Sequence, residues 1–262
     1  MSVGILTDLT KCIGCEACVW ACKEINGLSQ EGRAKRLSST TWTTIERNQG
    51  VNIRRQCMHC VEPACASVCP VTALEKTKTG PVIYHEDRCI GCRYCVMACP
   101  FEIPKYEWDS VLPKVQKCIM CYEKRVSKGR QPACTEVCPT GATMFGDRDK
   151  LLDLARHRME KHPDRYVDHI YGFQEAGGTS VLYLSDVPFE KLGFKAARTD
   201  VAYPKLTWRV LSQIPNVVSV GGVLMVGIWW IINRREKLEK VRNGEMTEEE
   251  AFGEERSDNK ET

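Results

Sequence analysis

The sequence lacks the signatures of enzymes that act on nucleotides or hydrolyse their substrates. No G-x-G-x-x-G stretch opens a helix, no P-loop is present, and no Ser, His and Asp set or carboxylate pair marks a catalytic pocket. Charge of one sign does not dominate either, because 37 Lys and Arg residues stand against 34 Asp and Glu residues, a formal net charge of +3. The chain is therefore expected to be non-catalytic by itself and to bind no nucleic acid.

Signals for export and oxidation are also missing. Residues 1–10 have no basic segment and no apolar run of seven or more residues, so no cleavable signal peptide is expected. No cysteine follows Cys138, whereas 16 cysteines lie between Cys12 and Cys138. A scaffold of eight disulfides would be typical of a small secreted chain, so the better interpretation is reduced thiolates that bind metal.

The cysteines form four groups of four that repeat one spacing. The first and third groups read C-x2-C-x2-C-x3-C. The second widens the middle gap and the fourth inserts a long loop there, but both begin with C-x2-C and end with C-x3-C-P. In chain order the groups are Cys12, Cys15, Cys18 and Cys22; Cys57, Cys60, Cys65 and Cys69; Cys89, Cys92, Cys95 and Cys99; and Cys118, Cys121, Cys134 and Cys138. This stretch is an internal fourfold repeat.

The spacing is typical of ligands to a 4Fe-4S cubane. A C-x2-C-x2-C loop supplies three thiolates and points backbone N–H groups at the sulfur atoms, and in two-cluster ferredoxins the fourth cysteine ligates the other cluster. Zinc ribbons are the rival interpretation, but they use two C-x2-C pairs separated by about 15 to 20 residues. The first and third groups instead crowd three cysteines within seven residues. Four 4Fe-4S clusters in two two-cluster modules are therefore expected.

Two ways of pairing the groups remain open. In nested pairing, the second and third groups form an inner module inserted in an outer module made of the first and fourth. In sequential pairing, the first group joins the second and the third joins the fourth, and spacing alone does not exclude it. The nested ligand sets are Cys12, Cys15, Cys18 and Cys138; Cys118, Cys121, Cys134 and Cys22; Cys57, Cys60, Cys65 and Cys99; and Cys89, Cys92, Cys95 and Cys69.

The four groups, the long loop of the fourth, and the stretch YGFQEAGGTSVLYLSDVPFEKL from Tyr171 to Leu192 carry a family resemblance. Over nearly its whole length the chain resembles the four-cluster iron-sulfur subunits of membrane-bound formate dehydrogenases and nickel-iron hydrogenases. The resemblance implies nested pairing, with four 4Fe-4S clusters because all sixteen ligand positions are Cys. It also implies a relay between a catalytic subunit, either a molybdopterin formate dehydrogenase or a nickel-iron hydrogenase, and an integral-membrane cytochrome b or quinone-reactive subunit.

The expected fold is α+β. It has two nested ferredoxin-like modules over 1–146, the inner one at about 50–105, then an irregular connector over 147–207. Within the connector, residues 147–168 predict one amphipathic helix that ends before Pro163, and residues 179–184 predict a β-like run.

One C-terminal transmembrane helix is expected within 208–234. Residues 214–232 are nineteen residues without a charge, about 29 Å of helix, against a hydrocarbon core of about 30 Å. Two basic residues closely precede this span and five follow it, at Arg234, Arg235, Lys237, Lys240 and Arg242. That bias predicts a single-pass protein of the cell inner membrane with a periplasmic cluster domain and a cytoplasmic, disordered tail over 235–262. Because no signal peptide is expected, the resemblance implies that the folded domain is exported together with a catalytic subunit that bears a twin-arginine signal.

Electron transfer is the expected function, because redox centres in series shorten each tunnelling step. The alternative is a structural or assembly protein whose clusters do not turn over. Cations beside the cysteine groups would favour reduction of the anionic clusters, and the candidates are Lys11, Lys23, Arg88, Arg93 and Lys117. His59 stands between two cysteines of a group that already has four, so we expect it on the loop surface and not as a ligand.

Overall fold

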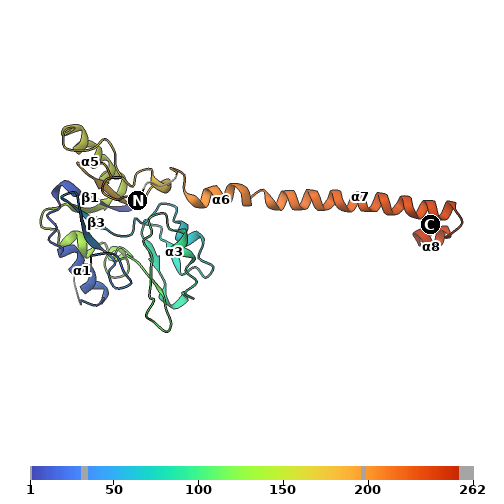
Figure 1. The fold of residues 1–262 in the computed structure, drawn as a ribbon, viewed down its shortest axis with the longest axis horizontal. Helices are drawn as coiled ribbons and strands as arrows, with labels where there is room; N and C mark the ends of the chain where they lie inside the picture. Colours follow the sequence, from blue (N-terminus) through green and yellow to red (C-terminus); the bar gives the residue numbers. More distant parts are fainter. Residues whose placement is uncertain (1, 31–34, 196–198, 254–262) are drawn as a thin grey trace, which may run out of the picture. The chain divides into compact units, whose positions relative to one another are not determined.

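The structure is a computed structural model that describes residues 2–30, 35–195 and 199–253. The chain folds into two compact units, Met1–Leu206 and Thr207–Thr262. The strands are β1 (Val3–Asp8), β2 (Thr44–Asn48), β3 (Val51–Arg55), β4 (Leu74–Lys76), β5 (Val82–Tyr84), β6 (Lys105–Tyr106), β7 (Val115–Gln116), β8 (Thr143–Asp147) and β9 (Val181–Leu184). The α-helices are α1 (Ala17–Asn26), α2 (Ala64–Ser67), α3 (Tyr94–Ala98), α4 (Ala133–Glu136), α5 (Arg148–Lys161), α6 (Tyr203–Leu211), α7 (Ile214–Arg242) and α8 (Glu248–Phe252) (Figure 1).

A three-stranded sheet in the order β8-β1-β9 brings distant parts of the chain together. Strand β1 is antiparallel to β8, with Thr7 opposite Thr143, and parallel to β9, with Ile5 opposite Val181. The first cysteine loop leaves the end of β1, and the last cysteine, Cys138, lies just before the start of β8. Antiparallel pairing therefore places the first and fourth cysteine groups at the same end of this sheet.

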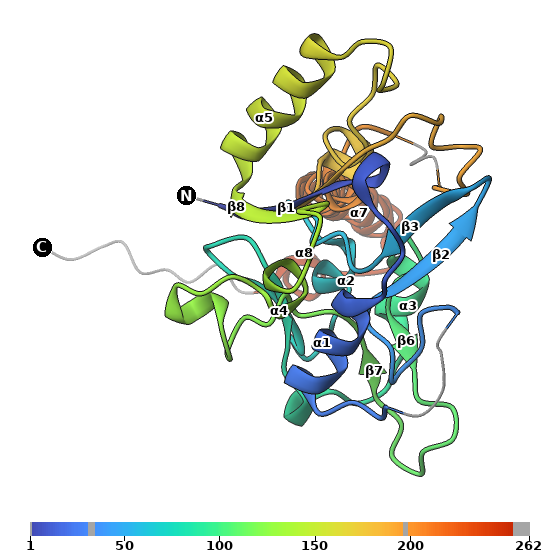
Figure 2. The same cartoon turned by 90° about the vertical axis from the view of Figure 1, so that its left-hand side faces the viewer.

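Four short helices accompany the cysteine groups (Figure 2). Helix α1 packs on α4, and α2 packs on α3. Each helix begins at or just before a cysteine of its group, so the loop before it and the helix together present the thiols. The helices of the first and fourth groups thus form one contact, and those of the second and third groups form another. Two small hairpins, β4–β5 and β6–β7, flank the second pair.

The connector expected over 147–207 belongs to the same compact unit as the cysteine groups, because that unit runs to Leu206. The predicted amphipathic helix is α5, which ends two residues before Pro163, and the predicted β-like run contains β9. The connector also supplies an aromatic cluster to the core, in which Tyr171 and Phe194 have ring centroids 4.6 Å apart. This segment is therefore built into the core, although it was expected to be irregular.

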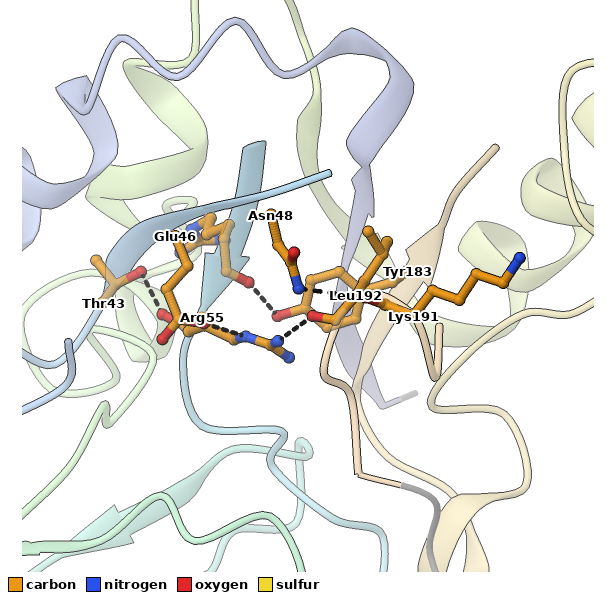
Figure 3. Close-up of polar contacts among 8 residues, drawn as sticks. Thr43, Glu46, Asn48, Arg55, Tyr183, Lys191 and Leu192 are labelled. Carbon is orange, nitrogen blue, oxygen red and sulfur yellow. Dashed lines mark hydrogen bonds and ion pairs between the residues drawn. The ribbon is translucent and has the colours of Figure 1, made fainter. Parts of the chain in front are cut away.

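Side chains of the β2–β3 hairpin donate hydrogen bonds to main-chain carbonyls of the connector (Figure 3). Asn48 Nδ2 donates to the Lys191 carbonyl at 3.2 Å, and Arg55 Nη2 donates to the Leu192 carbonyl at 2.8 Å. Arg55 also pairs with Glu46 across the hairpin at 3.0 Å. These bonds join two segments more than 130 residues apart, so they fix the position of β3 relative to the sheet.

A buried carboxylate links β1 to the connector. Asp8 is 0% exposed, and its Oδ2 accepts from Arg158 Nη1 at 3.0 Å and from the Tyr166 hydroxyl at 2.9 Å. Its Oδ1 accepts from the Thr10 hydroxyl at 2.7 Å, close to the first cysteine loop. Both carboxylate oxygens are therefore satisfied by groups from three parts of the chain.

Replacing Asp8 with Ala should destabilise this unit by about 2–4 kcal/mol, because a half-buried cation and a buried hydroxyl lose their acceptor together. Anaerobic denaturant unfolding of the full chain measures the effect. The matched control is Asp153→Ala, since Asp153 pairs with Arg156 on an exposed face of α5 and should cost less than about 1 kcal/mol. Equal midpoints for the two variants would contradict the prediction.

The second unit is dominated by α7, which has Pro215 in its first turn. The helical segment Tyr203–Arg242 is long and apolar enough to cross a membrane, and none of its apolar window is buried in the structure. The tail differs from expectation over 235–252. Helix α7 continues to Arg242, and α8 begins at a capping box between Thr247 and Glu250. The expected disorder over 254–262 lies outside the described residues.

Candidate iron-sulfur centres

The cysteine loops share a backbone conformation that only a few residue types adopt easily. Gly14 and Gly91 occupy equivalent positions in the first and third groups, with φ of +70° and +69°. Glu16 and Arg93, two residues further on, are also left-handed, with φ of +62° and +64°. A Cβ at Gly91 would come within 2.7 Å of the Pro113 carbonyl, so glycine is needed there both for conformation and for space.

This winding directs backbone N–H groups toward cysteine sulfur. Gly91 N lies 3.5 Å from Cys89 Sγ, and Met120 N lies 3.3 Å from Cys118 Sγ. Ala73 N donates to Cys69 Sγ at 3.2 Å in the same way. Donors of this kind stabilise a thiolate and tune the potential of a cluster bound to it. The repeat in the sequence is thus also a repeat in local geometry.

Two of the nested ligand sets each surround a small cavity. The first cavity is lined by four cysteines from the two ends of the repeat: Cys12, Cys15, Cys18 and Cys138. The second is lined by four cysteines from its middle: Cys69, Cys89, Cys92 and Cys95. Each cavity takes three thiols from one group and the last cysteine of another group.

The other two sets are gathered deeper in the unit. Burial raises the pKa of the Cys22 thiol well above its usual range, and its charged neighbours that add to this rise are Cys118, Cys134 and Cys121. Burial likewise raises the pKa of Cys60 well above its usual range, and its cysteine neighbours are Cys57, Cys99 and Cys65. Each set therefore brings four thiols within electrostatic reach of one another.

The donor chemistry fits iron-sulfur clusters. All sixteen cysteines are free thiols. Burial raises the pKa of Cys18 to about 11 and that of Cys65 to about 12, so these sulfurs become thiolates only where a cation offsets the charge. Among the described residues, no group of three or more His, Cys, Asp or Glu side chains is arranged to hold a single metal ion. Buried cysteine thiols gathered in this way are the ligands that iron-sulfur clusters use.

The candidate cations separate into buried and exposed ones. Lys23 is 3% exposed and Lys117 is 2% exposed, while Arg88 and Arg93 lie on the surface and Lys11 is half-buried. Lys117 Nζ donates to the Val82 carbonyl at 2.6 Å and to the Cys118 carbonyl at 3.1 Å. Lys117 is thus held in the interior beside a ligand position, as a cation that tunes a cluster would be.

The expected surface position of His59 is wrong. His59 is 0% exposed, its Nδ1 accepts from Val82 N at 2.9 Å, and burial followed by the charge of Lys117 holds its pKa well below its usual range. The imidazole is therefore neutral and carries its proton on Nε2. His59 also has φ of +48° in the cysteine loop, and no spacing pattern signals that conformation.

Sequence reasoning missed Arg54. Its side chain is 1% exposed and lines the first cavity, yet it lies outside every cysteine group. The only available signal is the alternation along β3, which does not tell whether Arg54 or Arg55 faces the interior.

Comparisons with known proteins agree with this chemistry. Residues 50–148 match the 4Fe-4S dicluster domain family, and residues 5–75 match the 4Fe-4S single cluster domain family. The chain is 40% identical to the hydrogenase-2 operon protein HybA of Escherichia coli O157:H7, over 73% of this chain and 72% of HybA. It is 37% identical to the iron-sulfur subunit of the nitrate-inducible formate dehydrogenase of Escherichia coli K12, over 70% of this chain and 67% of that subunit. It is also 34% identical to the formate dehydrogenase iron-sulfur subunit of Haemophilus influenzae, over 87% of this chain and 79% of the relative. The chain belongs to this family of 4Fe-4S electron-transfer subunits of formate dehydrogenase and hydrogenase complexes.

Proposed function

We propose that the chain relays electrons through four 4Fe-4S clusters. The observation that carries the proposal is that cysteines of different groups lie together, four around each of two cavities and the others within electrostatic reach of one another. The proposed ligand sets are Cys12, Cys15, Cys18 and Cys138; Cys22, Cys118, Cys121 and Cys134; Cys57, Cys60, Cys65 and Cys99; and Cys69, Cys89, Cys92 and Cys95. When bound, each cluster supplies a centre that accepts and releases one electron.

We propose nested modules as the arrangement of these sets. The packing of α1 on α4 and of α2 on α3 supports it, as does the antiparallel pairing of β1 with β8. The outer module then spans the two ends of 1–146, and the inner module lies at about 50–105. Residues 147–207 brace the two modules, since the connector shares their core.

The protein's own residues shield the centres from water and tune their reduction potentials. Most of the cysteines are buried or half-buried, and backbone N–H groups point at several of their sulfurs. Low dielectric around an anionic cluster disfavours its reduction, whereas nearby donors and cations favour it. Lys117 and the loop amides are therefore the groups through which this chain would set its potentials.

Two kinds of protein partner are proposed. One is a catalytic subunit, a molybdopterin formate dehydrogenase or a nickel-iron hydrogenase, and the other is an integral-membrane cytochrome b or quinone-reactive subunit. Exposed apolar side chains beside the second cavity support docking there, with Tyr94, Met97 and Trp108 being 61%, 85% and 72% exposed. Cys15 and Ile13 are exposed beside the first cavity, which gives the relay a second accessible end.

We further propose that α7 crosses the cell inner membrane once, with the cluster domain in the periplasm and the C-terminus in the cytoplasm. The uncharged span at 214–232 and the basic residues that follow it within α7 support this orientation. A partner that bears a twin-arginine signal would carry the folded domain across.

Anaerobic redox titration of the full chain, followed by EPR, tests the proposed function. We expect about sixteen irons per chain and four reversible centres, at least one of which the physiological donor reduces. Clusters that are present but do not titrate would replace the relay with a structural or assembly role. Fewer than four centres in fully loaded protein would contradict the proposed ligand sets.

A further inference from the structure

Arg54 is a buried cation whose position is fixed by strand geometry. Side chains alternate along β3, so Ile53 and Arg55 point to one side and Arg54 points to the other. Ile53, at 0% exposure, packs in the core cluster with Tyr183, and Arg55 lies over the Phe194 ring at 4.0 Å. The Tyr183 hydroxyl donates to the Arg54 carbonyl at 2.9 Å, which pins the main chain at this residue. Arg54 is consequently held on the side of the strand that faces the cysteines.

The guanidinium has more donors than the protein satisfies. Arg54 Nη2 donates to Gln56 Oε1 at 2.5 Å. Among the residues that the structure describes, Nε and Nη1 have no hydrogen-bond partner, and none of the ion pairs involves Arg54. A charged group buried with free N–H donors is costly unless something anionic lies within reach.

The anionic groups within reach are cysteine sulfurs of the outer module. Arg54 lines the first cavity together with Cys12, Cys18 and Cys138. It also interacts electrostatically with Cys134 and with Cys118, which belong to the neighbouring set. One guanidinium therefore borders the first cavity and lies within electrostatic reach of the neighbouring set as well.

We propose that Arg54 is a shared cation for the two outer clusters, donating its free N–H groups to sulfur at these sites and raising the reduction potential of both. This inference rests on the proposed function, since it needs clusters at the proposed sets. Sulfur of a cluster and of its thiolates accepts hydrogen bonds, and the positive charge stabilises the reduced, more negative form. The planar fork of arginine can reach two sites at once, whereas lysine presents one point charge.

Replacing Arg54 with Gln removes the charge and keeps much of the side-chain length, and Arg54→Lys keeps the charge without the fork. Arg47→Gln is the matched control, because Arg47 is an exposed residue of the same hairpin. Redox titration followed by EPR is carried out on the full, cluster-loaded chain for all three. In Arg54→Gln we expect two of the four midpoints to move to lower potential while the other two stay in place. Arg54→Lys should restore most of that shift, and Arg47→Gln should show none.

A fully loaded Arg54→Gln protein with four unchanged midpoints would overturn the inference, as would equal shifts of all four.

If Arg54→Gln loses clusters, iron and sulfide analysis shows how many clusters are lost. Loss of about half the iron with the two remaining midpoints unchanged supports a site shared by two clusters. Loss of all clusters from both Arg54→Gln and Arg54→Lys overturns it, because the residue would then hold the fold as a whole. Absence of reversible centres in the unmodified chain would instead reject the proposed function.

Discussion

Replacing Cys69 and Cys92 together with alanine should leave three native centres, the same number that each single replacement should leave. In the structure both residues line the second cavity, although they come from the second and third cysteine groups. If they ligate one cluster, the second replacement damages a centre that is already damaged. Their effects are then strongly non-additive, as is usual for residues that act as a unit.

The matched control joins Cys69→Ala to Cys15→Ala, because Cys15 lines the first cavity. That pair should leave two native centres, since it damages two different clusters. EPR counts the native centres and distinguishes a lost cluster from a three-iron remnant, and iron analysis gives the total. Sequential pairing predicts a different result. There Cys69 shares a cluster with Cys15, so the control would leave three centres and the first pair only two.

The sequence alone predicts candidate ligand positions because cluster ligation is local in the chain. The spacing within each group alone places at least two of its thiols on one cluster. The left-handed residues of the cysteine loops follow from the tight turns that this spacing requires. Pairing of the groups is different, because it depends on contacts such as Thr7 with Thr143 that bring the ends of the repeat together. No spacing within the groups encodes such a contact, so the sequence leaves nested and sequential pairing open.

Burial of polar groups is the other property that the sequence leaves undetermined. Arg54 and Arg55 are adjacent and chemically identical, yet one faces the cysteines and the other an aromatic ring. Which one turns inward depends on the register of β3 against β2 and on the anchoring by Tyr183. His59 likewise becomes interior only because β5 supplies Val82 N as its donor. These are tertiary relations between segments 20 to 130 residues apart.

Two arginines placed in the middle of α7 should abolish its stable insertion in the membrane. Val223 and Val226 lie near the centre of the uncharged span and are 73% and 65% exposed. An arginine at the centre of a transmembrane helix costs about 2.5–3.5 kcal/mol. The double replacement Val223→Arg and Val226→Arg therefore costs about 5–7 kcal/mol, which corresponds to a change of more than a thousandfold in partition.

The measurement is the share of the chain that stays in the membrane pellet after a carbonate wash, which strips proteins held only by partners. Val223→Leu with Val226→Leu is the matched control, since it changes the same positions and keeps them apolar. Glu236→Arg adds positive charge beyond the uncharged span and should also leave insertion intact, because basic residues already surround that position. If the double arginine variant stays in the pellet as the unmodified chain does, α7 is not the anchor. The second unit would then serve another purpose, since an exposed apolar run of nineteen residues has no stable place in water.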